Sequence, residues 1–583
     1  MTTPAIDLRT QAPFPPSPVP RELLDNASSL TEAFASLAGS FPDWESMIIL
    51  DRGRHESRLT ARALWDRARS IQAWLTAHDF QPGGIVLLTL PTGPEIVAAY
   101  FGVMLAGGAP GLVATPSNRL REPGIYARRV GTILANAEAA LLYCQEEVAQ
   151  QFREEPQLLA GARLATPADI PDASDAPDPI AAAPQDLATI QYSSGSTGTP
   201  KGILLTHQAM LNNIRAVRDG LKLTSADTSV NWIPLYHDMG LIDAFLLPLL
   251  SGSPSVLIPT FDFMRDPALW LWAIHHYRGT ISWSPNFAYT YCASRVPDQK
   301  LDGLDLDSWR VAINAAEPVL AATLELFQKR FVDYGFQPEA MTPAWGLAEN
   351  VTIATAHPVA DVPTSETIDR QAMVSEQVAR PTAGAGLESV AIGRCLPHCE
   401  VEIRAPDGAM LADRRIGDIF LRTDSLFRGY HRMDEETNRA LRDGWLATGD
   451  RGYLVDGDLY FITRDKDLIV IGGEKYAPHD IEVQVNELEG IRQGCVVCFG
   501  VLSEATGTEE LAVVAETRDL DEEKLAALRR AVRDKVTGTT GLSARHVLLV
   551  EPGGIEKTTS GKLARRATRE RYADQIGGSA VRD

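Results

Sequence analysis

Apolar runs that alternate with helical segments are the feature that most restricts the fold of this chain. Ile85–Leu90 is a continuous apolar run of strand length, and Thr60–His78 and Gly93–Gly107 on either side have helical patterns. A strand that is apolar on both faces must be covered on both faces, as in mainly parallel sheets with helices on each side. We therefore predict an α/β protein with layered sheets.

The same alternation continues along most of the chain. Further strands are predicted at Ala140–Tyr143, Ser229–Ile233, Ser255–Ile258 and Thr280–Ser284, and further helices at Gln208–Leu221, Leu241–Leu250 and Pro267–Tyr277. From Ile392 onward the pattern changes to short alternating strands and tight turns, which predicts a smaller β-rich unit over residues 392–463. Together these segments predict a large N-terminal domain over residues 1–463.

The last part of the chain has the pattern of one small α+β domain, residues 464–583. Its predicted helices and strands are Pro478–Leu488, Cys495–Val501, Leu511–Glu516 and Glu522–Val536. This domain contains Cys495-Val-Val-Cys498, which we interpret as part of a buried strand, with a redox or metal site as the alternative.

Composition excludes some classes of function. The chain has 583 residues, which predicts several domains, and its net charge of −21 argues against a nucleic-acid partner. Its six cysteines are scattered, as expected in a reducing cytoplasm. Met1–Pro20 is proline-rich, lacks a signal-peptide pattern and is predicted to be loose, and Ile96–Gly107 is too short to span a bilayer. We expect a soluble, cytoplasmic protein without a transmembrane segment.

The run YSSGSTGTPKG, Tyr192–Gly202, lies between two strand-like segments. Glycines allow the backbone to approach a ligand closely, and hydroxyl and N–H groups can bind anionic oxygens. The run therefore predicts a polyphosphate site, with a polar surface hairpin as the alternative. It does not fit the P-loop of phosphoryl-transfer enzymes, because Thr199 and Pro200 separate Gly198 from Lys201.

The run instead resembles the phosphate loop of the adenylate-forming superfamily, which includes acyl-CoA ligases and fatty acyl-AMP ligases. Four further motifs of that superfamily follow in its order. They are PLYHDMG with His237, PAWGLAE with Trp345 and Glu349, GWLATGD with Asp450 followed by Arg464, and TTSGKL with Lys562. Each polar residue alone has an ordinary structural explanation, as a core histidine, a turn charge or a tail lysine. The set in this order covers roughly two thirds of the chain.

Three features resemble the fatty acyl-AMP ligase branch. They are LYHDMG at Leu235–Gly240, the pair SPNFAY and NAAEPV at Ser284–Tyr289 and Asn314–Val319, and the long polar interval Thr355–Val390. Other positions depart from that branch: Ala315 replaces a glycine, Trp345 replaces a tyrosine, and the turn Ile471–Lys475 is closer to acyl-CoA ligases.

The resemblance implies roles for particular residues. Catalysis is assigned to Lys562, His237 and Glu349, with Lys562 at the transition state, His237 beside the substrate carboxylate and Glu349 on magnesium. Trp345 is assigned to adenine, Asp450 and Arg464 to ribose, Thr197 and Glu349 to the metal, and Lys466 to a hinge. The whole set for ATP binding is Ser193, Ser194, Gly195, Ser196, Thr197, Gly198, Lys201, Ala316, Glu317, Pro318, Trp345, Gly346, Leu347, Asp450 and Arg464.

These assignments imply a two-step enzyme that uses ATP and Mg²⁺. A fatty acid would be converted to acyl-AMP with release of pyrophosphate, and the acyl group would pass to the phosphopantetheine thiol of an acyl carrier protein. Rotation of the C-terminal domain about Lys466 would separate the steps. The alternatives are a fatty acyl-CoA ligase and a non-catalytic acyl-nucleotide-binding protein. Phe287, Tyr289 and Leu241 could line an acyl tunnel or pack in the core.

Overall fold

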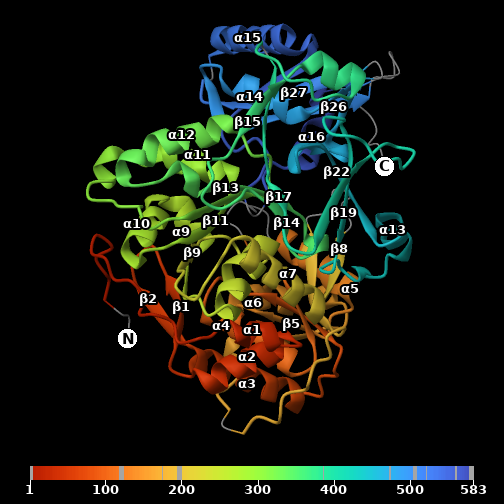
Figure 1. Cartoon of the computed structure of the whole chain (residues 1–583). Coiled ribbons are helices and arrows are strands. Elements are labelled where there is room, and N and C mark those ends of the chain that lie inside the picture. Colours follow the sequence, from red (N-terminus) through yellow and green to blue (C-terminus); the bar gives the residue numbers. More distant parts are fainter. Residues whose placement is uncertain are drawn as a thin grey trace.

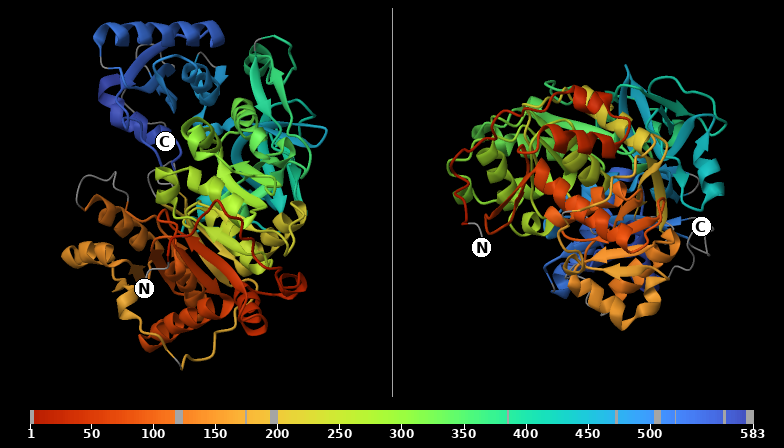
Figure 2. Two further views of the ribbon diagram at one scale, coloured as in Figure 1. Left: turned by 90° about the vertical axis from the view of Figure 1, so that its left-hand side faces the viewer. Right: turned by 90° about the horizontal axis from the view of Figure 1, so that it is seen from below.

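The computed structural model describes residues 4–116, 124–173, 175–193, 200–384, 386–471, 474–502, 509–519, 521–558 and 561–576. Figure 1 shows the helices α1 to α4 at one end of the molecule and the C-terminal elements α14 to α16 at the other. The right-hand view of Figure 2 looks along this axis from the N-terminal end.

A nine-stranded sheet forms the centre of the N-terminal part, with strand order β17-β14-β13-β12-β11-β9-β10-β1-β2. Its strands are β1 (Glu45–Leu50), β2 (Glu56–Thr60), β9 (Ser229–Asn231), β10 (Ser255–Leu257), β11 (Ile281–Pro285), β12 (Val311–Ala315), β13 (Met341–Gly346), β14 (Ile353–Ala356) and β17 (Arg394–Cys395). The run from β1 through β10, β9, β11 and β12 to β13 is parallel, and strands pair antiparallel at both edges.

A second, parallel sheet contains the apolar run predicted at Ile85–Leu90. Its strands, in the order β4-β3-β5-β6, are β3 (Ile85–Thr89), β4 (Ala109–Leu112), β5 (Leu141–Cys144) and β6 (Arg163–Ala165). Every residue of β3 is buried, because β4 and β5 pair with its two edges and other elements cover its faces. The predicted parallel, layered α/β arrangement is confirmed here.

The helices of the N-terminal part connect and cover these sheets. They are α1 (Glu22–Asn26), α2 (Leu30–Ser40), α3 (Ala61–Ala77), α4 (Pro94–Leu105), α5 (Ile125–Ala137), α6 (Glu146–Glu154), α7 (His207–Gly220), α8 (Leu247–Leu250), α9 (Thr260–Arg265), α10 (Ala268–Tyr277), α11 (Asn286–Arg295) and α12 (Ala321–Phe331). Thr60 caps α3 as predicted, because its side chain accepts a hydrogen bond from Ala63 N at 3.1 Å.

Three smaller sheets follow. The hairpin of β7 (Leu187–Ser193) and β8 (Lys201–Thr206) gains β20 (Gly429–Tyr430) as a third strand. The predicted β-rich unit contains an antiparallel sheet of β18 (Cys399–Arg404), β19 (Gly417–Thr423), β21 (Leu441–Arg442), β22 (Trp445–Val455) and β23 (Asp458–Arg464), with helix α13 (Asp434–Ala440) beside it. The long polar interval Thr355–Val390 contains the hairpin of β15 (Ser365–Ile368) and β16 (Leu387–Val390).

Residues after Arg464 form the α+β elements at the top of Figure 1. They are β24 (Ile469–Ile471), β25 (Glu474–Tyr476), α14 (Pro478–Asn486), β26 (Ile491–Leu502), β27 (Glu509–Thr517), α15 (Glu522–Thr540), β28 (Ala544–Val550) and α16 (Arg565–Ile576). Cys495 and Cys498 are buried on β26, as predicted, and belong to separate apolar clusters on its two faces.

One local prediction was wrong, and a second, the helix at Leu241–Leu250, was confirmed without its helix type. Residues 4–20 are not loose along their whole length, because Leu8 and Val19 are buried and Ala12 N donates a hydrogen bond to His276 O. The predicted helix Leu241–Leu250 is a π-helix over Met239–Leu246, followed by α8. Apolar periodicity does not distinguish an α-helix from the wider π-helix, which is often found at functional sites.

Candidate active site

His237 lies just after β9, at the carboxyl edge of the parallel strands. Its Nδ1 is 2.6 Å from Asp238 Oδ1, and Asp238 also accepts a hydrogen bond from Met239 N at 2.7 Å. Burial alone would raise the pKa of Asp238, but the adjacent His237 and the more distant Lys562 lower that pKa to about 2. A charged carboxylate therefore contacts one nitrogen of the imidazole, Nδ1.

Lys562 reaches the other nitrogen of that imidazole from the C-terminal part. Its Nζ is 2.9 Å from His237 Nε2. An ammonium group only donates hydrogen bonds, so Nε2 is the acceptor and the proton of the neutral ring belongs on Nδ1, facing Asp238. Burial lowers the pKa of Lys562, whereas Asp238 and Glu317 favour its charged form. Asp238, His237 and Lys562 thus form one hydrogen-bonded row.

A tight turn presents Lys562 to the site. Thr558 N donates to Lys562 O at 2.7 Å, and Lys562 N donates to the Thr558 side chain at 3.1 Å. Gly561 has φ of +92°, and a Cβ on it would lie 3.1 Å from the Phe287 ring. A glycine suits this position because the backbone is left-handed and the neighbouring ring is close.

The motif NAAEPV joins the same side of the site. Ala316 has a left-handed backbone, with φ of +71°, and the following Glu317 accepts a hydrogen bond from Phe287 N. Burial raises the pKa of Glu317, while Lys562 and Lys557 act in the opposite direction. Pro318 follows in the loop before α12, so the predicted nucleotide-binding loop lies next to the turn that carries Lys562.

Glu349 lies beside the phosphate-loop hairpin. Tyr430 donates its hydroxyl proton to Glu349 Oε1 at 2.8 Å, and Lys201 Nζ lies 5.2 Å from the centre of the Tyr430 ring. The other carboxylate oxygen of Glu349 makes no hydrogen bond or ion pair within the described ranges. Tyr430 connects the predicted metal ligand to the predicted phosphate-binding lysine.

Trp345, Asp450 and Arg464 are in contact. The buried indole N–H of Trp345 donates to Asp450 Oδ2 at 2.8 Å, and Arg464 Nε is 3.4 Å from Asp450 Oδ1. Burial raises the pKa of Asp450, and Arg464 and Trp345 oppose this effect. The residues predicted for adenine and ribose are therefore adjacent, and Trp345 orients the Asp450 carboxylate through its N–H group.

Gly346 and Leu347 continue β13 toward Glu349. A Cβ on Gly346 would lie 2.2 Å from Thr352 O, so only glycine fits this approach. Leu347 N donates to the same oxygen at 3.0 Å. Lys466 follows Arg464 in a short turn, and burial lowers its pKa while Asp450 and Glu349 favour its charged form.

Some predicted positions lie outside the described residues. Ser194, Gly195, Ser196, Thr197 and Gly198 are in this group, as is the side chain of Ser193. The described ends of this loop, Ser193 and Lys201, are paired across the β7–β8 hairpin. Gly472 and Gly473 of the turn that departs from the fatty acyl-AMP ligase pattern are also outside the description.

Sequence reasoning did not assign roles to Tyr430 or Asp238. Asp238 follows His237 directly, and that adjacency is a usable signal for a carboxylate that orients an imidazole. Tyr430 reaches Glu349 only because β20 pairs with β8. No local pattern encodes that pairing, so the sequence offered no comparable signal for Tyr430.

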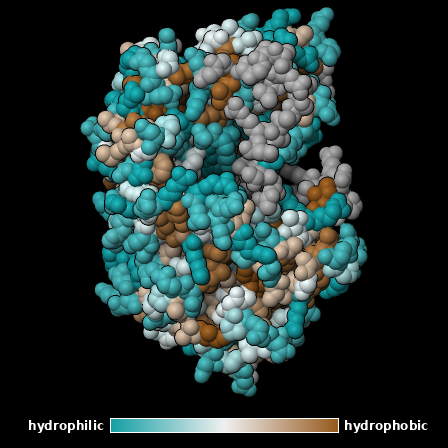
Figure 3. Space-filling model, turned by 90° about the vertical axis from the view of Figure 1, so that its right-hand side faces the viewer, coloured by the Kyte–Doolittle hydropathy of each residue, from teal (hydrophilic) through white to brown (hydrophobic). Residues whose placement is uncertain are grey.

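Figure 3 shows a mainly hydrophilic face with a hollow between its upper and lower parts. No group of three or more His, Cys, Asp or Glu side chains in the described ranges could hold a metal ion without other ligands. None of the helices in the described part of the chain combines the length and apolar character of a membrane span.

Comparison with known proteins gives consistent matches. The profile of the family described as AMP-binding enzyme matches residues 34–431, more than half of the chain. A Caulobacter vibrioides protein named "Putative acyl-CoA synthetase" is 33% identical, over 89% of this chain and 91% of its own length. The long-chain-fatty-acid–AMP ligase FadD32 of Mycolicibacterium smegmatis is 30% identical, over 85% of this chain and 86% of its own.

A third relative and a solved structure extend these matches. The medium-chain-fatty-acid acyl-carrier-protein ligase JamA of Moorena producens is 30% identical, over 90% of this chain and 92% of its own. A solved chain from a study of fatty acyl-adenylate ligases of E. coli and L. pneumophila superposes with a TM-score of 0.88 at 31% identity. It covers 94% of this chain and 99% of its own.

Proposed function

Because this chain belongs to the AMP-binding enzyme family, we propose that it activates a fatty acid as acyl-AMP and transfers the acyl group to a carrier-protein thiol. The relatives named as fatty acyl-AMP ligases and the ligase JamA support the substrate class and the acceptor. The observation that carries the proposal is the 2.9 Å contact between Lys562 and His237, which places a cation beside the imidazole predicted to face the substrate carboxylate.

In the first step, a carboxylate oxygen of the fatty acid forms a bond to the α-phosphorus of ATP. The bond from that phosphorus to the bridging oxygen breaks, and pyrophosphate leaves. Negative charge accumulates on the entering and leaving oxygens, and the Lys562 ammonium stabilises this charge. Asp238 keeps the proton of His237 on Nδ1, so that Nε2 accepts the hydrogen bond from the Lys562 ammonium.

Several groups of residues would hold the nucleotide. Asp450 and Arg464 would bind the ribose and Trp345 the adenine, with Ala316, Glu317 and Pro318 alongside. Ser193, Ser194, Gly195, Ser196, Thr197, Gly198 and Lys201 would bind the phosphates. The Trp345–Asp450 hydrogen bond supports this assignment because it fixes both groups before ATP arrives.

Glu349 fits a magnesium ion. Mg²⁺ in phosphate sites takes one or two carboxylates together with phosphate oxygens and water, and Glu349 has one carboxylate oxygen oriented by Tyr430 and the other without a partner in the described residues. Thr197 would be the second protein ligand. The ion would neutralise charge on the phosphate oxygens.

Purified protein with Mg²⁺, ATP and a series of fatty acids tests the first step. We expect release of pyrophosphate and formation of acyl-AMP, detected by mass spectrometry. A protein that binds acyl-nucleotide but releases no pyrophosphate would instead be a non-catalytic binder.

The acceptor is tested by adding either CoA or a carrier protein that bears its phosphopantetheine arm. We expect the acyl group on the carrier protein. A fatty acyl-CoA ligase is the second candidate, favoured by the C. vibrioides relative and by the turn Ile471–Lys475. Efficient formation of acyl-CoA would replace the carrier protein as the proposed acceptor.

A further inference from the structure

A carboxyl group with one unpaired oxygen is buried next to the active site. Asp243 lies on the π-helix Met239–Leu246, five residues after the N-cap Asp238 that follows His237, and is 1% exposed. Its Oδ1 is 3.2 Å from the Thr352 hydroxyl oxygen. Its Oδ2 has no hydrogen-bond partner in the described part of the chain. A charged carboxylate with a bare oxygen in this position would be very costly.

The Thr352 hydroxyl determines the protonation state of Asp243. This hydroxyl is also 2.8 Å from Asn213 Oδ1 and has only one proton to donate. The Asn213 amide is oriented by its Nδ2 group, which donates to Ile353 O at 3.3 Å, and therefore offers its oxygen to Thr352. Thr352 thus donates to Asn213, and the proton in the Asp243–Thr352 contact must come from Asp243.

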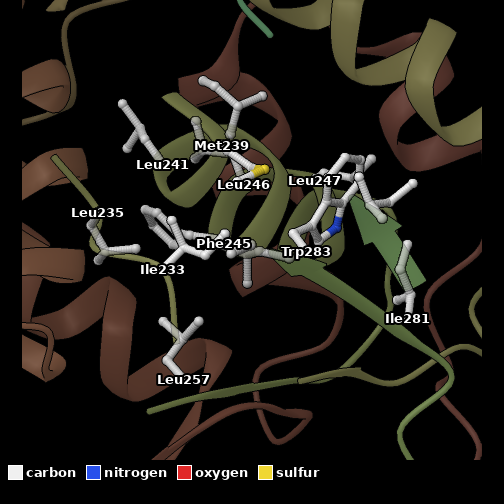
Figure 4. Close-up of a cluster of buried hydrophobic side chains, with 14 of the residues drawn as sticks. Ile233, Leu235, Met239, Leu241, Phe245, Leu246, Leu247, Leu257, Ile281 and Trp283 are labelled. Carbon is white, nitrogen blue, oxygen red and sulfur yellow. The ribbon is translucent and has the colours of Figure 1, made fainter. Parts of the chain in front are cut away.

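The surroundings agree with a neutral carboxylic acid. Figure 4 shows apolar side chains around the π-helix, including Leu241 and Phe245 on either side of Asp243 in the sequence. Burial raises the pKa of Asp243 well above its ordinary value, and the charge of Asp238 acts in the same direction.

The Thr352 end of the contact belongs to a strained turn directly behind Glu349. Val351 has φ of +68° and ψ of −63°, and Thr352 N donates to Asn350 O at 2.8 Å across it. This is a γ-turn of the rare strained hand, which is especially unfavourable for a β-branched residue. Such strain persists only where neighbouring contacts hold the turn in place.

We propose that Asp243 acts as a neutral carboxylic acid that donates to Thr352 and so fixes the turn behind Glu349 to the helix that follows His237. Asp243 is a positioning residue in this role, because it touches neither substrate nor nucleotide. Through this contact Asp243 sets the distance between His237, predicted to lie beside the substrate carboxylate, and Glu349, predicted to bind the metal. The inference rests on the proposed adenylation reaction.

Four variants test the proposal by pyrophosphate release. Asp243→Asn keeps a neutral donor for Thr352, and we expect its kcat to stay within about threefold of the wild type. Asp243→Val removes the donor, and we expect kcat to fall by about 10², because misplacement of reacting groups by roughly 1 Å has this effect. The KM for ATP should change much less, since the contact does not bind ATP. Thr352→Ser and Thr352→Val are the matched pair at the other end of the contact, since serine keeps the hydroxyl group and valine removes it.

The outcomes separate the inference from the function it rests on. Equal loss in Asp243→Asn and Asp243→Val, or wild-type kcat in Asp243→Val, contradicts the positioning role. A wild-type protein that releases no pyrophosphate contradicts the proposed function instead. If Asp243→Val does not fold, as judged by its thermal unfolding, the comparison of Thr352→Ser with Thr352→Val tests the positioning role instead.

Infrared spectroscopy gives a readout independent of activity. The difference spectrum of wild type minus Asp243→Asn at neutral pH should contain the carbonyl band of a protonated carboxylic acid. A carboxylate band in its place overturns the neutral state of Asp243.

Discussion

Lys562 and Asp238 lie at opposite ends of the hydrogen-bonded row that His237 joins. Both groups are partly buried, and each favours the charged form of the other. His237 lies between this cation and this anion and contacts both of them. Single substitutions at either end should therefore have different effects.

Lys562→Ala should reduce the rate of acyl-AMP formation by about 10²–10³, because one preorganised charge at the transition state is lost. ATP binding should stay largely intact, as measured by titration calorimetry. Lys535→Ala is a matched control, since Lys535 makes only a surface ion pair with Glu487. An unchanged rate in Lys562→Ala would refute the assigned role.

Asp238→Asn tests the lowered pKa of Asp238. A carboxyl group whose folded pKa lies below its unfolded pKa stabilises the fold above the unfolded value, and this contribution is lost as pH falls through the folded value. With a folded pKa of about 2 against an ordinary value of 3.8, the stability advantage of wild type over Asp238→Asn should shrink by about 1 kcal/mol between about pH 5 and pH 3. Urea unfolding at several pH values measures it. A constant difference over that range would mean that the pKa of Asp238 is not lowered.

At the scale of elements, the polar interval Thr355–Val390 contacts the C-terminal part. Arg370 forms two hydrogen bonds with Asp480 of α14, at 2.7 and 2.6 Å, and both side chains are largely buried. Arg565 similarly pairs with Glu482 on the same helix. Helix α14 is thus held by two arginines, one from the N-terminal interval and one from the chain just after Lys562.

Arg370→Gln should loosen α14 from the interval, because removing one partner of a buried ion pair leaves the other charge uncompensated, at a cost of about 3–5 kcal/mol. We expect faster amide hydrogen exchange over Pro478–Asn486. Arg380→Gln is the control, since Arg380 belongs to the same interval and makes only an exposed pair with Glu376. Equal exchange in the two variants would show that the Arg370 pair does not hold the helix.

At the scale of the whole molecule, the C-terminal part has Lys562 in the site predicted for adenylation. A thiol acceptor needs access to the same acyl group, so the second step calls for a different placement of this part. The predicted hinge, Lys466, lies in the short segment between β23 and β24.

Lys466→Pro should retain acyl-AMP formation and lose transfer to the carrier protein, because proline fixes φ near −65° and restricts the residue before it. Lys466→Ala removes the charge but leaves the backbone free to rotate, so this variant should transfer the acyl group to the carrier protein at the normal rate. Chromatography of acyl-AMP together with mass spectrometry of the carrier protein measures both steps. Transfer at the wild-type rate in Lys466→Pro would place the hinge elsewhere.

Much of the fold could be predicted from local sequence. The strand Ile85–Thr89 and the helix after Thr60 depend on neighbours within a few residues, and both were predicted. The π-helix was not, because its apolar pattern is the same as that of an α-helix. The order of the five motifs was also enough to predict the adenylate-forming superfamily.

The sequence by itself determined the helices, the strands and the residue types that a nucleotide site needs, since these depend on short-range periodicity and composition. Only the tertiary structure decided that Lys562 meets His237 across 325 positions, that Tyr430 orients Glu349, and that Asp243 meets Thr352. Hydrogen-bond partners and burial arise when distant segments pack together, and no local pattern in the chain records which segments will meet.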